Sequence, residues 1–245
     1  MFAQTAPNQT ASTPEIPDWA LPAGPNHKQY PPPPDFHRPT KNFDIALGIF
    51  QGESDVGGPL VPGSASYDSQ TRQYTITSAG YNIWYTRDEF RYVWKKLSGD
   101  VSFAANVSFP VPQDPPHDRK MVMVIRQDLD DDSKEIMVAE HGTGMVHLAV
   151  REAKNALIKD MQYRIGGSLL LGLMPQRIGI EKHGDEFSLF ISVKGEMMHQ
   201  YGPSIPLQMS APFYVGIGFC SHYPVTPDTG VFSNVLLANR AGKMR

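Results

Sequence analysis

Cysteine, long apolar runs and net charge are all scarce in this sequence, and each shortage excludes a class of protein. The 245 residues include one cysteine, Cys220, so neither an internal disulfide nor a metal site built from several thiolates is possible. The longest apolar run, SLLLGLM at 168–174, is too short to cross a bilayer. A net charge of −3 gives no electrostatic reason to expect binding to nucleic acid or to an anionic membrane.

Familiar catalytic motifs are also absent. The sequence contains no GxSxG, HExxH or GxGxxG motif and no phosphate-binding GxxxxGK followed by Ser or Thr. It also lacks the ExDxE spacing with which many sandwich-fold glucanases place two carboxylates on one strand face. A familiar retaining glycosidase is therefore not indicated, although carboxylates from different strands could still meet.

Short β-like segments with turn signals between them follow one another from Phe43 onward, and no long helical pattern interrupts them. GDVSFAANVSF alternates in polarity, whereas KMVMVIRQ is apolar on both faces, as a central strand covered by two layers would be. EKHGDEF predicts a hairpin turn through Gly184 and Asp185. The spacing of the segments predicts an all-β protein, a two-sheet antiparallel β-sandwich of the jelly-roll type, over residues 41–240.

Residues 1–40 are rich in proline and predict an extended arm rather than a packed domain. A flexible leader is an equally good interpretation of residues 1–12. The opening MFAQTAP lacks the basic segment and apolar core of a signal peptide, but it fits the end of a trimmed one, cleaved at Ala3. We therefore expect a periplasmic or secreted protein, although a single cysteine also fits a reducing compartment.

The stretch DLDDDSKE at 128–135 resembles a calcium loop, because a hard cation binds several oxygen ligands close together. Asp128, Asp130 and Asp132 are the candidate ligands for Ca2+. The stretch lacks the glycine and the terminal Glu spacing of an EF-hand. A solvated acidic turn between two strands is the alternative interpretation.

No two of the eight histidines have the spacing of a zinc motif, so a structural role is the first expectation for most of them. His141 and His222 are exceptions, because each ends a predicted strand beside a turn, where a site is accessible.

Two arginines also lie at predicted strand ends. Arg126 shares a strand face with Val122 and Val124, and Arg151 follows small or apolar residues in the same way. Such arginines can grip a carboxylate or neighbouring hydroxyl groups. The alternative is an interstrand salt bridge, for example with Glu140 or Glu152.

The run GYNIWYTRDEFRYVWKK at 80–96 is the richest in aromatic residues. Read as strand, turn and strand, it places Trp84 on the face of Asn82, and its turn places Asp88 beside Trp84. Packing in the core is the commoner role for aromatic side chains, and we expect it for one of the two aromatic sets. Trp84 and Asp88 are the pair that we expect to face a ligand.

Several of these segments together resemble a known family. ESDVGGPLVPGSASYD, the run at 80–100, VIRQDLDDDSKEIMVAEHGTG, RIGIEKHGDEFSLFIS and YVGIGFCSHYPVTPDTGVFSNV resemble the concanavalin-A-like lectin and glucanase sandwich. They look most like its poorly characterised branch related to enolase-regulation-type proteins, which is found beside TolB-like propellers. The resemblance implies two curved antiparallel sheets with a concave face, and its matching polar positions are Asp55, Trp84, Asp88, Arg126, Asp128, His141, Arg151 and His222. It supplies no reaction.

Three functions follow as hypotheses. The first is a carbohydrate-binding, lectin-like domain of a bacterial exported protein that holds a saccharide on the concave face; its candidate ligand-binding residues are Asp55, Trp84, Arg126 and Arg151. The second is a glycan-active enzyme, a glycoside hydrolase or polysaccharide lyase, whose candidate catalytic residues are Asp88, His141, Glu152 and His222. The third is a structural or protein-interaction domain that uses the proline-rich arm. A filled, apolar concave face would count against the first two.

Overall fold

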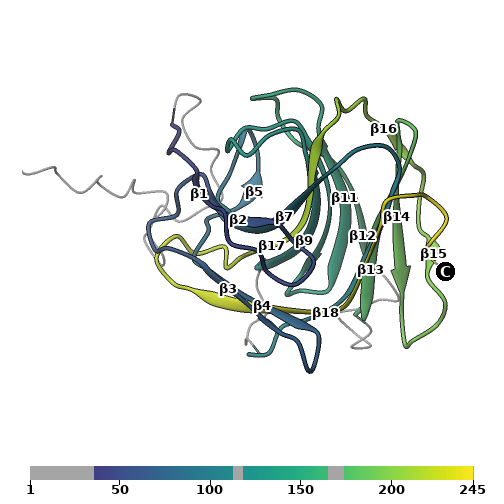
Figure 1. Ribbon diagram of the computed structural model, residues 1–245, viewed down its shortest axis with the longest axis horizontal. Coiled ribbons are helices and arrows are strands. Elements are labelled where there is room, and N and C mark those ends of the chain that lie inside the picture. The colour runs from purple at the N-terminus through teal and green to yellow at the C-terminus, as the bar shows by residue number, and fades with distance from the viewer. Residues whose placement is uncertain (1–35, 113–117, 165–173, 245) are drawn as a thin grey trace, which may run out of the picture.

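The computed structural model describes residues 36–112, 118–164 and 174–244. These residues form strands and connecting loops with no helix, and so include no helix long and apolar enough to cross a membrane. Two antiparallel sheets pack face to face (Figure 1). The all-β sandwich predicted from the sequence is confirmed.

The first sheet is curved, and the strands at its centre are long (Figure 1). Its strands run in the order β1 (Lys41–Phe43), β2 (Gly52–Val56), β7 (Phe90–Leu97), β17 (Phe213–Cys220), β9 (Lys120–Arg126), β10 (Glu135–His141), β11 (Met145–Arg151) and β12 (Lys159–Arg164).

The second sheet covers one face of the first. Its strands run in the order β15 (His199–Gln200), β14 (Glu186–Ser192), β13 (Arg177–His183), β8 (Val101–Ser108), β18 (Asp228–Ala238), β4 (Gln73–Ser78) and β3 (Ser64–Asp68), with β16 (Ile205–Pro206) paired to β14. The hairpin predicted through Gly184 joins β13 to β14, where Gly184 has the positive φ of 58° that glycine adopts at little cost.

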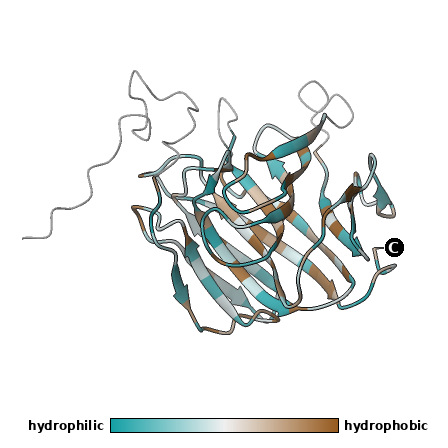
Figure 2. Cartoon of the chain, turned by 90° about the horizontal axis from the view of Figure 1, so that it is seen from above, coloured by the Kyte–Doolittle hydropathy of each residue, from teal (hydrophilic) through white to brown (hydrophobic). Residues whose placement is uncertain are grey.

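The main core lies between the sheets. Alternation along β9 sends Met121, Met123 and Ile125 into this core, where they meet Phe103 of β8 and Ile180 of β13. Hydrophobic residues, brown in Figure 2, recur along the central strands. Every residue of β9, β10 and β11 is buried, so both faces of the first sheet are covered, as the sequence of β9 predicted.

Loops cover the other face of the first sheet, which we call the outer face. The miniature hairpin of β5 (Ile83–Trp84) and β6 (Arg87–Asp88) lies over it, and Val122 and Val124 of β9 pack against Ile83 in a second apolar cluster. Phe90, Tyr92 and Trp94 of β7 also belong to this cluster. The centre of the outer face is therefore filled with apolar side chains, which counts against saccharide binding or catalysis there and leaves only its ends for polar chemistry.

Candidate functional site

The two ends of the outer face carry different polar groups, although the same three strands supply both. At one end, Arg126 of β9, Glu135 of β10 and Arg151 of β11 lie in one row of the sheet register. At the other end, Lys120 of β9 lies opposite His141 of β10. Side chains on one face of a strand recur every second residue, so this arrangement follows from the alternation of the three sequences.

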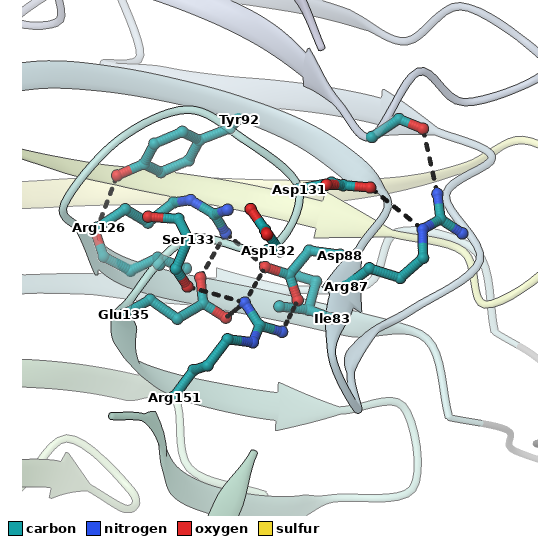
Figure 3. Close-up of polar contacts among 12 residues, drawn as sticks. Ile83, Arg87, Asp88, Tyr92, Arg126, Asp131, Asp132, Ser133, Glu135 and Arg151 are labelled. Atoms are coloured by element: carbon teal, nitrogen blue, oxygen red, sulfur yellow. Dashed lines mark hydrogen bonds and ion pairs between the residues drawn. The ribbon is translucent and has the colours of Figure 1, made fainter. Parts of the chain in front are cut away.

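The first end is a closed cluster of four ionisable side chains, Asp88, Arg126, Glu135 and Arg151, which we call the charge cluster. Asp88 lies between the two guanidinium groups (Figure 3): its Oδ2 accepts from Arg126 Nη1 at 2.7 Å, and its Oδ1 accepts from Arg151 Nη2 at 2.6 Å. Glu135 accepts from both arginines as well. All four side chains are fully buried, so no part of the cluster is available to a ligand.

Burial and pairing move the pKa values of the two carboxyl groups in opposite directions. Burial acts to raise the pKa of Asp88, but the charges of Arg151 and Arg126 outweigh it and hold that pKa below its usual value. Burial raises the pKa of Glu135 to about 8, and Arg126 opposes the shift only in part. Both carboxyl groups contact both guanidinium groups, and the charge on Asp88 repels a second charge on Glu135.

A second layer of ion pairs fastens the β5–β6 hairpin above the charge cluster. Arg87 donates to Asp131 at 3.3 Å and to Glu89 at 3.2 Å. Arg38 and His37, at the start of the described chain, pair with Glu89 and Asp131 respectively. The loop at 128–134 and residues 37–38 thus hold the hairpin against the sheet.

The other end of the outer face is an open pocket with a volume of about 200 Å³, which we call the histidine pocket. Its walls are formed by Trp84, Asp118, Lys120, His141, Met145, His147 and His222. These residues come from five separate segments of the sequence. The pocket combines one partly buried indole, one ammonium, one carboxylate and three imidazoles, which suits a small polar ligand.

Lys120 lies between the pocket and the hairpin. Its Nζ donates to Asn82 Oδ1 at 2.6 Å and approaches the carbonyl oxygen of Ile83 at 3.4 Å. The same ammonium lies 4.8 Å from the ring centroid of Trp84, at the distance of a cation–π contact. Burial lowers the pKa of Lys120.

Burial favours the neutral form of the imidazoles of His141 and His147. His141 Nδ1 lies 3.2 Å from Asp118 Oδ1, and burial lowers the pKa of His141 to about 4 although this hydrogen bond opposes the shift. Burial likewise lowers the pKa of His147 well below its usual value. The ring of His147 stacks on Trp84 at 5.4 Å, and neither of its nitrogens has a hydrogen-bond partner. His141 Nε2 also has none, and His147 Nδ1 lies 3.9 Å from Asp160 Oδ2. The Nε2 atoms of His141 and His147 are therefore the two nitrogens of these rings without any polar partner among the described residues.

Two residues with a positive φ lie beside this pocket, and Arg72 and Lys194 adopt the same backbone region elsewhere in the described chain. Tyr85, next to Trp84, has a φ of 54°, and His222 has a φ of 69°. Residues other than glycine adopt this region uncommonly, although asparagine, aspartate and histidine do so more often than the rest, and such residues are found at functional sites. The backbone N–H of His222 donates to the carbonyl oxygen of Gly80 at 3.0 Å, and its ring stacks on Tyr81 at 6.1 Å. Both strained residues therefore flank the pocket.

The structure divides the candidate residues from the sequence into three groups. Trp84, His141 and His222 come together in the histidine pocket. Asp88, Arg126 and Arg151 come together in the charge cluster, away from solvent. Two others lie apart from both: Asp55 pairs with Arg91 at 3.1 Å, and the exposed Glu152 pairs with Lys159 at 2.6 Å.

The candidate calcium ligands Asp128, Asp130 and Asp132 surround the ammonium group of Lys154. Lys154 Nζ lies 3.7 Å from Asp128 and 3.4 Å from Asp132, and it contacts Asp130 more closely. Across the described ranges, no group of three acidic, histidine or cysteine side chains is placed to hold a metal ion. The loop thus has the geometry of an acidic turn neutralised by a lysine.

Sequence reasoning missed several residues of the pocket. Lys120 and Asp118 lie in or beside a strand whose apolar residues dominate its pattern, and His147 was given a structural role. The alternation of side chains along two strands could have identified them. Lys120 shares a strand face with Arg126, and His147 shares a strand face with Arg151. These faces indicate that both residues point to the same side of the sheet as the predicted site.

A larger cavity of about 420 Å³ lies at the edge between the two sheets, lined in part by Glu140, Arg119, Phe109 and Gln176. Glu140 is buried, Oε2 of its carboxyl group has no hydrogen-bond partner, and burial raises its pKa well above the usual value. Arg119 is already paired with Asp228 at 2.8 Å. The charged group that could have neutralised Glu140 is thus engaged elsewhere.

Comparisons with known proteins identify the fold. No protein-family model matches the sequence, and no curated protein sequence matches it at a significant level. A functionally unknown protein from Saccharomyces cerevisiae has a similar structure, with a TM-score of 0.54 and 14% identity over 74% of this chain and 95% of that chain. A xylan β-1,4-xylosidase from Bacillus halodurans C-125 has a TM-score of 0.50 and 11% identity over 84% of this chain. The alignment covers 40% of the xylosidase chain, so this protein spans less than half of that enzyme.

Lectin II from Ulex europaeus is a more distant neighbour, with a TM-score of 0.42 and 9% identity over 81% of this chain and 99% of the lectin chain. The similarities to the yeast protein and to the xylosidase show a shared fold and nothing of activity. The two-sheet β-sandwich predicted from the sequence is thus also the fold of these two neighbours.

Proposed function

We propose that the protein is a lectin-like module that binds one sugar residue of a glycan in the histidine pocket. The observation that carries this proposal is the contrast along the outer face. Its centre is filled and its far end is closed by the charge cluster, whereas one end keeps a polar pocket beside a partly buried tryptophan.

The groups in the pocket suit a sugar. An indole offers an apolar surface to the C–H groups of a sugar ring, while imidazole nitrogens and Asp118 offer hydrogen bonds to its hydroxyl groups. A volume of about 200 Å³ is below the range of roughly 300–1,000 Å³ typical of drug-sized ligands. The pocket therefore fits a single residue, such as the end of a chain, better than a long stretch of polysaccharide.

A glycan array probed with the purified protein tests this proposal, followed by calorimetry on each hit. We expect Trp84→Ala to abolish binding, because Trp84 forms one wall of the pocket. Tyr67→Ala is the matched control: Tyr67 is also a partly buried aromatic, but it belongs to β3 of the second sheet. Loss of binding in both variants, or in neither, would contradict the assignment to this pocket.

Catalysis on a glycan is the second candidate, and the pair of His141 and Asp118 favours it. A carboxylate that accepts from one imidazole nitrogen orients the ring and leaves the other nitrogen to act as a general base. His141 Nε2 is unpartnered and the ring is neutral above about pH 4, so the base is available at neutral pH. Asp118 is the one carboxylate among the residues described as lining this pocket, which favours a lyase over a hydrolase that needs two carboxylates.

Product analysis on each array hit separates binding from catalysis. If the protein is an enzyme, we expect shortened glycans with the wild type and none with His141→Gln, while His141→Gln still binds. Turnover should rise with pH through about 4 and then stay level, because His141 loses its proton there. Binding without products would support the lectin-like function alone.

Export from a bacterial cell and membership of the enolase-regulation-type branch are parts of the same proposal. They are supported by the sequence resemblance, and fractionation of the native cells tests the first of them. A role of the proline-rich arm in binding a partner protein is a further alternative; residues 1–35 of the arm lie outside the described residues.

A further inference from the structure

The ammonium group of Lys120 lacks a counterion, unlike most of the buried cations around it. Arg87, Arg91, Arg126 and Arg151 each contact at least one carboxylate. Lys120, equally buried, forms no ion pair within the described part of the chain, and its polar contacts are the two neutral oxygens of Asn82 and Ile83. A buried charge without a counterion is costly, so a structure that retains one calls for an explanation.

The groups around Lys120 do not supply the missing charge. Asp118 lies at the solvent-exposed side of the pocket and pairs with His141, while His141 and His147 are neutral. Cys220 is the partner of Lys120 in the sheet register, and burial raises the pKa of its thiol to about 11, so it carries no charge at neutral pH. The carboxylates of Asp118, Asp88 and Asp160 act to raise the pKa of Lys120 and so favour its charge, but burial outweighs them and lowers that pKa.

We propose that the sugar bound in the histidine pocket is an acidic one, a uronic acid whose carboxylate pairs with Lys120. This inference rests on the proposed saccharide-binding function. The ligand's carboxylate supplies the counterion that the protein omits, and its hydroxyl groups meet the unpartnered nitrogens of His141 and His147. A single ammonium matches the single charge of a carboxylate; no arginine, which a phosphate would favour, is among the described residues that line this pocket.

Binding measurements on matched sugars test the inference with the full-length protein. Glucuronic, galacturonic and mannuronic acids are compared with their methyl esters and with the neutral parent sugars by ligand-observed NMR and calorimetry. We expect at least one acid to bind about tenfold or more tightly than its methyl ester, because a buried charge pair commonly contributes more than the 1.4 kcal/mol that a tenfold change requires. The preference should weaken as salt is raised.

The variant Lys120→Met tests whether the charge of Lys120 causes the preference for the acid. It keeps the length of the side chain and removes the charge, so we expect the acid and its ester to bind equally. Lys182→Met is the matched control: Lys182 is also buried, but it lies in β13 of the second sheet, beside the rings of Phe187 and Phe213. That variant should keep the preference for the acid.

The outcomes separate this inference from the proposed function. Equal binding of acid and ester by the wild type would overturn the inference and leave saccharide binding intact. An acid preference that survives in Lys120→Met would also overturn it. If neither acidic nor neutral sugars bind, both proposals fail. The comparison of acid with ester needs no variant, so it remains decisive even if Lys120→Met does not fold.

Discussion

The charge cluster and the histidine pocket lie on one sheet face and draw on the same three strands, yet they follow opposite rules. In the charge cluster every buried charge meets an opposite charge, and Asp88 alone contacts two arginines. In the histidine pocket a buried ammonium has only neutral oxygens as hydrogen-bond partners, and the Nε2 atoms of His141 and His147 have no hydrogen-bond partner among the described residues. The polar groups of the charge cluster find their partners within the protein, whereas several polar groups of the histidine pocket are left for a ligand to pair with.

This difference separates a structural use of charge from a functional one. Buried polar groups that pair with one another hold loops in place, and removing one of them leaves the others without a partner. Polar groups left incomplete cost stability, which natural proteins accept where a ligand repays it. Substitutions in the charge cluster should therefore reduce stability much more than substitutions in the histidine pocket, which should mainly affect ligand binding.

The largest effect is expected from Asp88→Ala. Removing this carboxylate leaves two buried guanidinium groups with Glu135 as their main counterion, so we expect the free energy of unfolding to fall by about 3–5 kcal/mol. Urea denaturation of both proteins measures the loss. Glu152→Ala is the control, because it breaks an exposed ion pair with Lys159 and should cost less than about 1 kcal/mol. Similar losses in the two variants would refute the distinction between a closed cluster and the surface.

A medium effect on the free energy of unfolding is expected from Glu135→Gln, and the size of this effect depends on pH. The folded-state pKa of Glu135 is raised to about 8, so the folded state binds a proton more tightly than the unfolded chain does. The contribution of this group to stability is therefore full at low pH and is lost as pH rises from about 4.5 to about 8. We expect the wild type to lose stability over this range through Glu135 and the variant not to lose it.

Denaturation curves at several pH values measure this slope. The buried Glu140 also has a raised pKa and adds to the slope in both proteins, so the difference between variant and wild type is the relevant quantity. An unchanged slope in Glu135→Gln would show that Glu135 is ionised in the folded protein throughout this range.

The smallest effect on stability is expected from His147→Phe in the histidine pocket. His147 is fully buried, and neither of its ring nitrogens forms a hydrogen bond. An apolar ring of similar shape removes two unsatisfied groups and keeps the stacking on Trp84, so stability should change by less than about 1 kcal/mol, in either direction. Saccharide binding should nevertheless be lost. Thermal unfolding and calorimetry on the same sample test both halves, and a large destabilisation would place His147 among the structural residues.

The sequence predicted the fold well because the long strands have strong local patterns. The alternation in GDVSFAANVSF and the doubly apolar KMVMVIRQ correspond to β8 and β9, a strand at the core and a strand covered on both faces. The turn at Gly184 has a glycine where the backbone needs a positive φ. These signals depend on residues near in sequence, and they therefore survive without knowledge of the tertiary structure.

Such local signals do not predict which side chains pair with one another across the outer face. Alternation showed where Arg126 and Arg151 point, but Asp88 reaches them from a hairpin 38 and 63 residues away in the sequence. The prediction that Asp88 accompanies Trp84 toward a ligand treated 80–96 as continuous strands, whereas its β5 and β6 have two residues each. In the short hairpin Ile83 is opposite Asp88 and Trp84 is opposite Arg87, so the two candidate side chains separate toward different ends of the face.

The β5–β6 hairpin has a consequence for how the chain folds. Two strands of two residues each have too few hydrogen bonds and too little apolar surface to be stable alone. Asp88 of the hairpin can be paired only when β9, β10 and β11 already present Arg126, Glu135 and Arg151 in one row. We therefore expect the hairpin to dock late, after the sheet has formed, so that the walls of the pocket are completed in the last step of folding.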